Sequence, residues 1–130
     1  MLKKTFSSNR EREKIKLKKE ERAIGIISVC SEIIKLDGSL GIIEYHRHFS
    51  PEFLSNDYEE HIRPVLYKNL HLLPQTIISI AFKIDDKIAE CNFEEEIDDH
   101  NMSVLVKSYE EMILMAKRTL LNNKTFLENE

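Results

Sequence analysis

The chain has 130 residues, 42% of them hydrophobic and 32% charged, with a formal net charge of −4. These proportions are typical of one folded globular domain with a real core, and they exclude a disordered chain. No apolar run approaches the roughly 20 residues that a transmembrane helix needs, and no secretory signal is visible at the N-terminus. We therefore expect a single-domain cytoplasmic protein.

Charge is divided unevenly along the chain. Residues 1–22 hold nine Lys and Arg against four Glu, a net charge of about +5, whereas residues 23–130 hold ten basic against nineteen acidic residues, about −9. This division predicts a basic, charged helical extension over 1–22, a single all-α domain over 23–122 and a polar tail over 123–130 that is frayed.

The first predicted element is a long helix. Side-chain oxygens in Ser7-Ser8-Asn9 can cap its beginning, and no proline interrupts it before Leu36. Its first half is charged on all sides and contains pairs at helical spacing such as Glu13/Lys16. Its second half has a broad apolar face, formed by Ala23, Ile26, Ile27, Cys30, Ile33 and Ile34. We expect a helix whose tip protrudes and whose base enters the core, and which Gly38 ends in the left-handed conformation.

The elements that follow are predicted to be helical as well. The expected order is a short helix over Ile42–His48, a helical turn beginning at Ser50-Pro51, a capping box at 56–59, a break at Pro64, a short helix over Val65–Leu72, a helix that Pro74 opens over 75–90, and a last helix from about Asn101. The sequence thus predicts an all-α, compact bundle of about five to seven helices with a long, partly protruding basic N-terminal helix.

Catalytic patterns are absent from the sequence. It contains no GxSxG, P-loop, GxGxxG or HExxH motif, so we expect no enzyme and no catalytic residues. Cys30 and Cys91 are far apart and lie among apolar residues, which predicts buried free thiols. His46 and His48 would point about 200° apart on a helix and could share a metal ion only on a strand or loop. We interpret them as solvated or core histidines.

One short motif carries the most specific functional signal. In "EIIKLDGSLGIIE", Glu32 to Glu44, an Asp-Gly pair is followed by an aliphatic residue and a closing acid. An EF-hand loop has a similar second half, but Ile33 and Lys35 would then stand at ligand positions that require oxygen donors. The motif resembles the helix "xxIAxADGxVxxxE" of tellurite-resistance TerB-like helical domains. "FKIDDKIAECNFEEE", from Phe82, resembles a degenerate second copy in which Asp86 replaces the glycine.

The TerB resemblance implies a bundle in which two acidic helix-end turns lie close together and bind a divalent cation such as Ca²⁺. The residues that would supply the ligands are Asp37, Glu44, Asp85 and Glu94. The resemblance also implies a role in a stress-response or membrane-adjacent complex. The alternative is that both turns merely end helices, since Asp and Gly are common there. Segments 26–33 and 77–84, which share four of eight residues, are either a duplicated unit or a chance recurrence of aliphatic positions.

Two charged segments are candidate partner-binding surfaces. The basic one contains Arg10, Arg12, Lys14, Lys16, Lys18 and Lys19, and the acidic one, 93–100, contains Glu94, Glu95 and Glu96. We expect a small non-enzymatic interaction or regulatory protein whose partner is another protein. The alternative is a phage-, plasmid- or immunity-type regulator that binds nucleic acid or a protein target through these segments, although four glutamates interrupt the basic one. Homo-oligomerisation stays open.

Overall fold

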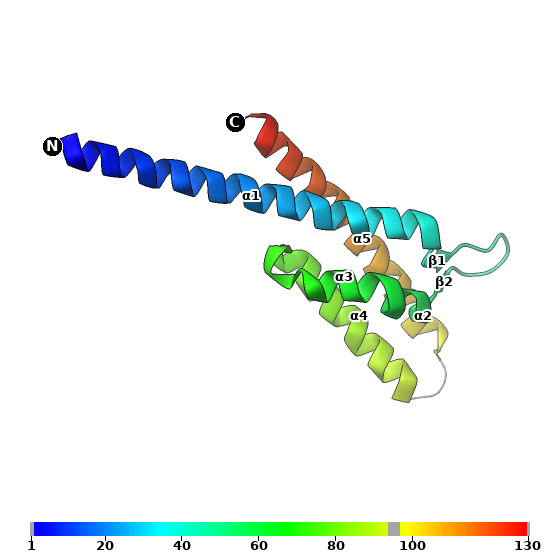
Figure 1. The fold of residues 1–130 in the computed structure, drawn as a ribbon. Helices are drawn as coiled ribbons and strands as arrows, with labels where there is room; N and C mark the ends of the chain where they lie inside the picture. Colours follow the sequence, from blue (N-terminus) through cyan, green and yellow to red (C-terminus); the bar gives the residue numbers. More distant parts are fainter. Residues whose placement is uncertain (1, 94–96, 130) are drawn as a thin grey trace.

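The computed structural model describes the backbone of residues 2–93 and 97–129, and side chains from Asn9 onward outside the gap. The elements are α1 (Leu2–Leu40), β1 (Ile43–Glu44), β2 (Glu52–Phe53), α2 (Ser55–Asp57), the π-helix η1 (Tyr58–Ile62), α3 (Arg63–Lys68), the 3₁₀-helix η2 (Leu70–Leu72), α4 (Gln75–Phe93) and α5 (Asp99–Glu128). The expected all-α class is confirmed, with one small hairpin added (Figure 1). None of the described helices is long and apolar enough to cross a membrane.

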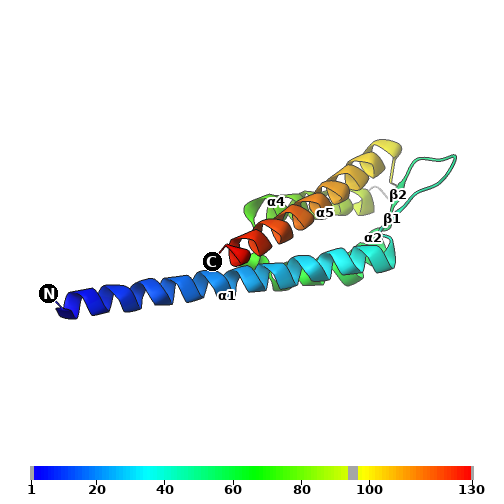
Figure 2. The same ribbon diagram turned by 90° about the horizontal axis from the view of Figure 1, so that it is seen from above.

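Helix α1 dominates the shape of the molecule. At 1.5 Å per residue its 39 residues span about 58 Å. In both ribbon views its N-terminal half extends beyond the rest of the chain, while its C-terminal half lies against the other helices (Figures 1 and 2). Arg22 joins α1 to the body, because its Nη1 donates to the carbonyl of His71 at 3.0 Å. One turn later Gly25 lies so close to Leu72 that a Cβ there would be 3.2 Å from Leu72 Cδ1.

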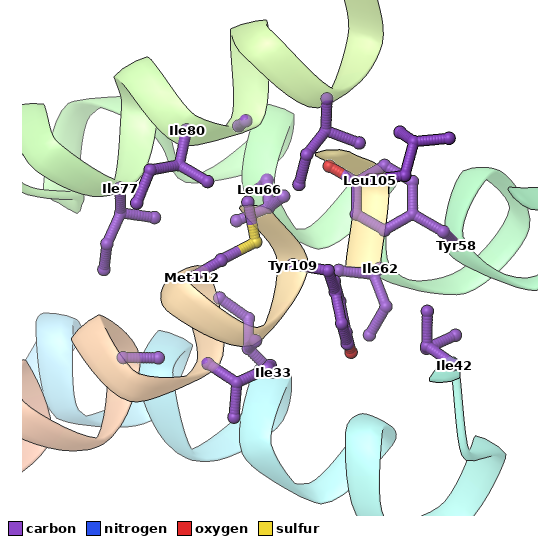
Figure 3. Close-up of a cluster of buried hydrophobic side chains, with 14 of the residues drawn as sticks. Ile33, Ile42, Tyr58, Ile62, Leu66, Ile77, Ile80, Leu105, Tyr109 and Met112 are labelled. Carbon is purple, nitrogen blue, oxygen red and sulfur yellow. The ribbon is translucent and has the colours of Figure 1, made fainter. Parts of the chain in front are cut away.

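The core forms between α1, α4 and α5, with η1 and α3 closing one side. Figure 3 shows side chains from these helices directed toward one another, among them Ile33 from α1, Ile77 from α4 and Met112 from α5. All three side chains are completely buried. Burying an aliphatic side chain of this size contributes about 1.5–3 kcal/mol, so the three-helix contact holds the base of α1 in place.

An aromatic cluster lies at the hairpin end of this core. The ring centroids of Phe53, Tyr58 and Tyr109 are 5.4 to 6.0 Å apart, in tilted and edge-to-face orientations. These distances and angles are those that aromatic pairs favour. The cluster joins β2, η1 and α5, and so fixes the hairpin to the helices.

The predicted end of α1 at Gly38 is wrong. The helix continues to Leu40, and Gly41 is the glycine with a left-handed backbone, at φ +60°. Its amide donates to the carbonyl of Asp37 at 3.0 Å, which closes the last turn. Asp37 and Gly38 therefore belong to the final turn of the helix. They do not form a turn after it.

The predicted helix over Ile42–His48 is also wrong. The chain instead forms an antiparallel hairpin in which Ile43 pairs with Phe53 and Glu44 with Glu52. The buried side chains of Ile42 and Phe53 fix this register, and the amide of Leu54 donates to the carbonyl of Ile42 at 2.8 Å. Ser50 and Pro51 accordingly precede a strand and do not begin a helical turn.

Other expectations differ in detail from the structure. A break or kink of the helical pattern was expected at Arg63, before Pro64. The helical run is not broken there, but it changes from the π-helix η1 to α3 at Arg63, and Pro64 is the second residue of α3, where its missing N–H is tolerated. The described residues form four helices longer than one turn, α1, α3, α4 and α5, fewer than the five to seven expected. The last helix begins at Asp99, close to the prediction, but it reaches Glu128, so the predicted frayed tail is wrong.

Candidate functional site

The predicted basic surface lies on the part of α1 that extends beyond the body of the protein (Figures 1 and 2). We define the arm as residues 9–21 of this helix. Every side chain from Asn9 to Lys19 is exposed, including two large apolar ones, Ile15 and Leu17, at 53% and 56%. The six predicted partner-binding residues therefore all lie at the surface: Arg10, Arg12, Lys14, Lys16, Lys18 and Lys19.

The helical geometry divides these six residues into two groups. On α1 Ala23, Cys30 and Ile33 are buried, Ile26 between them is partly buried, and Val29 is buried at one edge of this face. The alternating spacing of three and four at 23, 26, 30 and 33 continues outward to Lys19, Lys16 and Arg12. Ile15 lies on the same face. We call these four residues, 12, 15, 16 and 19, the basic stripe. Arg10, Lys14 and Lys18 point to a different side of the helix, at 100° per residue.

Like charges are neighbours along the basic stripe. Arg12 and Lys16 are four residues apart, and Lys16 and Lys19 are three apart. Such pairs destabilise a helix by about 0.2–0.5 kcal/mol each, because their charges lie about one turn apart on one face. The stripe thus continues the buried face of α1 in position but replaces its apolar residues by positive charge.

The predicted acidic patch is described only at its ends. Glu94, Glu95 and Glu96 lie outside the described residues. Phe93, the last residue of α4, is 91% exposed. Asp98 has a structural task, because its Oδ1 accepts the amide of Asn101 at 2.7 Å and caps α5.

Asp37, the first predicted cation ligand, is held by a tyrosine. The buried Tyr109 donates its hydroxyl to Asp37 Oδ1 at 2.8 Å, across the contact between α5 and α1. Burial and this carboxylate both raise the pKa of Tyr109, since each disfavours the phenolate. In Figure 3 the Tyr109 ring points from α5 toward α1.

Glu44, the second predicted ligand, lies in the hairpin. It is directly opposite Glu52 in the register, and His46 Nε2 is 3.6 Å from Glu52 Oε2. One ligand atom from each of Glu44, His46 and Glu52 lies within 4.8 Å of the others, the one such group found among the described residues. All three residues are at or near the surface, and water competes for each group there.

Asp85, the third predicted ligand, is inside α4 and not at a helix end. It accepts a hydrogen bond from the hydroxyl of Tyr67, and its Oδ1 lies 3.4 Å from Arg63 Nε. Arg63 also stacks over the Tyr67 ring, with 5.3 Å between Cζ and the ring centroid. These contacts join α3 to α4 and give the carboxylate a structural role.

The predicted four-residue cation site is thus not gathered at one point in the described part of the chain. Asp37, Glu44 and Asp85 have separate partners, and Glu94 is not described. Sequence reasoning missed the tyrosine partners. The signal was available for Tyr109, because the hydroxyl of a tyrosine on the apolar face of a helix usually has a hydrogen-bond partner. What the spacing could not reveal is that this partner is Asp37.

Comparisons with protein-family models, with curated proteins and with solved structures find no match to this chain. The resemblance to TerB-like domains therefore stays a prediction.

Proposed function

We propose that this protein is a small, non-enzymatic interaction protein that binds an acidic protein partner along the basic stripe of α1. The observation that carries the proposal is the continuation of the buried heptad face of α1 into an exposed arm as Arg12, Ile15, Lys16 and Lys19. A helix with acidic residues on one face would fit there, because it would extend the helix-helix contact that α5 makes with the base of α1.

The energetics of the arm support a bound partner. A helical segment of this length is marginal in water without tertiary contacts. Arg12, Lys16 and Lys19 place like charges next to one another on the stripe, while Glu13 and Glu20 lie at helical-neighbour spacing from Lys16, and an acidic partner would add attraction along the stripe. Ile15 supplies one apolar contact at the centre of the stripe, where it is 53% exposed in the free protein.

A protein partner fits better than nucleic acid. The stripe has the spacing of a helix-helix contact. Glutamates at 13, 20 and 21 lie on the other sides of the same helix, and Glu11 lies at the edge of the stripe beside Ile15. A duplex surrounds a bound helix with phosphates on both sides, so these glutamates would oppose it. Nucleic-acid binding through the arm is the alternative that the experiment separates.

The test uses two charge-reversal variants with equal net charge. The stripe variant combines Arg12→Glu, Lys16→Glu and Lys19→Glu, and the control combines Arg10→Glu, Lys14→Glu and Lys18→Glu on the other side of the helix. Partners captured from the source cells by the wild-type protein are compared quantitatively for the two variants. We expect the stripe variant to lose its partner and the control to retain it.

Two results would contradict the proposal. Equal losses in both variants would indicate an unspecific electrostatic attraction. Binding to DNA or RNA oligonucleotides that weakens steeply with salt and falls equally in both variants would favour the nucleic-acid alternative. Sedimentation of the wild-type protein, the stripe variant and the control variant measures whether the chain binds to a second copy of itself.

Divalent-cation binding by a TerB-like module is a separate proposal. Its support is the Asp-Gly motif and the partly buried Asp37 carboxylate in the last turn of α1. Calorimetric titration with Ca²⁺ tests it, with Asp37→Asn as the variant. Absence of heat with the wild-type protein would remove the cation from the function.

A further inference from the structure

A pocket of about 380 Å³ lies where the end of α1, the hairpin and α5 meet. Its size is within the range of small-molecule sites. It lies at the opposite end of α1 from the arm, so it is independent of the partner binding proposed for the arm, and it shares Asp37 with the proposed divalent-cation site. The lining combines carboxylates, tyrosines and aliphatic side chains from elements far apart in the sequence.

Two carboxylates line this pocket. Asp37 Oδ1 accepts the hydrogen bond of Tyr109, which is itself only 1% exposed, so the Asp37 side chain is held in one orientation. At the rim, Tyr45 donates its hydroxyl to Glu110 Oε2 at 3.2 Å. The pKa of Tyr45 is raised, mainly by partial desolvation and then by the negative charges of Glu110 and Asp37. Both carboxylates thus act on this phenol.

The remaining lining is mainly apolar. Ile43 comes from β1, and Ile113 and Leu114 come from α5. Leu114 is 46% exposed, so it leaves an aliphatic surface open beside the acidic groups. Lys117 is the one cationic residue of the lining, against two carboxylates. The pocket therefore favours a ligand with one positive group and a short apolar stem.

We propose that this pocket binds an alkylammonium group, with the ammonium on the carboxylate of Asp37 and the stem against Ile43 and Leu114. An ammonium fits better than a guanidinium, because Tyr109 occupies one oxygen of Asp37 and the bidentate pairing of a guanidinium needs both. A lysine side chain of a partner protein and a free aliphatic amine share this chemistry.

The probe is pentylamine, titrated into the full-length ¹⁵N-labelled protein and followed by amide chemical shifts. We expect saturable shifts at Gly41 and Leu114. 1-Pentanol and pentanoate have the same stem without the positive charge, and each should bind at least about tenfold more weakly, since a charge-assisted hydrogen bond is lost.

The diagnostic variant is Asp37→Asn, which keeps an oxygen to accept the Tyr109 hydroxyl and removes only the charge. Its affinity for pentylamine should fall about tenfold. Lys117→Gln removes the opposing cation and should raise the affinity about threefold. The matched control is Asp86→Asn, which removes an exposed carboxylate from α4 and should change nothing.

Equal binding of pentanol and pentylamine, or equal effects of Asp37→Asn and Asp86→Asn, would overturn the proposal. So would shifts at Gly41 and Leu114 that Ca²⁺ causes and pentylamine does not. The peptide acetyl-Ala-Lys-Ala-amide separates the two sources of the ligand: binding at least as tight as that of pentylamine indicates a partner's lysine, and binding of pentylamine without the peptide indicates a free amine.

Discussion

Two buried tyrosines differ in what their hydroxyl groups contact. Tyr109 donates to Asp37, whereas the hydroxyl of Tyr58, fully buried, has no hydrogen-bond partner among the described residues. A buried hydroxyl without a partner contributes nothing that offsets its desolvation, while one that donates to a carboxylate contributes about 1.5–3 kcal/mol. The same substitution should therefore have opposite consequences at these two positions.

We predict that Tyr109→Phe lowers the free energy of unfolding by about 1–2 kcal/mol, because Asp37 loses its hydrogen bond while partly buried. Tyr58→Phe should leave the free energy of unfolding unchanged or raise it slightly. Urea denaturation of both variants measures the difference, and each serves as the control for the other, because both lose one hydroxyl from the same aromatic cluster. Equal losses would show that the hydrogen bond to Asp37 contributes nothing.

The buried thiol and phenol groups predict a second property, the dependence of stability on alkaline pH. Burial raises the pKa of the Cys30 thiol to about 11, from an ordinary value near 9. Burial also raises the pKa values of Tyr58 and Tyr109. Between pH 9 and 11 the unfolded chain loses protons that the folded chain retains, so the free energy of unfolding should fall steadily as pH rises.

Denaturation midpoints from pH 7 to 11 test this response. The contribution of Cys30 is isolated by Cys30→Ala, whose stability is lower at neutral pH because of the cavity but should decline less steeply above pH 9. A parallel decline in both proteins would assign the whole effect to the tyrosines. Near pH 7 all three groups are neutral in both states, and they should cause no pH dependence there.

At the scale of elements, the end of α1 depends on one of two nearby glycines. Gly41 has the left-handed backbone, at φ +60°, whereas Gly38 is inside the helix with open space around it. A side chain is strained in the left-handed conformation by about 1–2 kcal/mol. In an exposed helical position, alanine is better than glycine by about 0.5–1 kcal/mol.

Gly41→Ala should thus lower the free energy of unfolding by about 1–2 kcal/mol, and Gly38→Ala should raise it by about 0.5–1 kcal/mol. Thermal unfolding followed by circular dichroism measures both. The opposite pair of signs would mean that the helix ends at Gly38, as the sequence alone suggested.

These elements also show how far the sequence could predict the structure. The long helices α1, α4 and α5 were predictable because apolar residues repeat over several turns in each. The hairpin was not, since its strands have two residues each, too few for alternation to show. Gly38 and Gly41 are equally good as helix ends in sequence, and only the contact of Ile42 with the core decides between them.

The candidate sites were predictable only where they depend on residues close together in the sequence. Exposure of the arm followed from its charge, and its three basic stripe residues were among those expected to bind a partner. The partners of Asp37 and Asp85 were not predictable, because Tyr109 is 72 residues from one and the contacts of the other depend on how α3 packs on α4. The analogy of Asp85-Asp86 with Asp37-Gly38 predicts a turn at Asp85, although α4 continues through it.

At the scale of the whole molecule, the arm and the body should behave as separate units. Arg22 donates a hydrogen bond to His71, Ala23 is buried and Gly25 lies close to Leu72, whereas the side chains of 9–19 are all exposed. Because the described side chains of the removed segment, 9–19, are all exposed, the melting temperature of a chain that lacks residues 1–19 should change by no more than about 2 °C. The helical circular-dichroism signal per molecule should fall, because the removed segment is helical.

Removing six further residues should have a different result. A chain that begins at Ile26 loses the Arg22 hydrogen bond, the buried Ala23 and the close contact of Gly25 with Leu72. We expect this chain to unfold at least about 10 °C lower, or not to fold cooperatively, because α1 would enter the core without its first packed turn. Calorimetry of the two truncated proteins decides the matter. Equal losses in both would show that the arm stabilises the body, and the arm could then not be reserved for a partner.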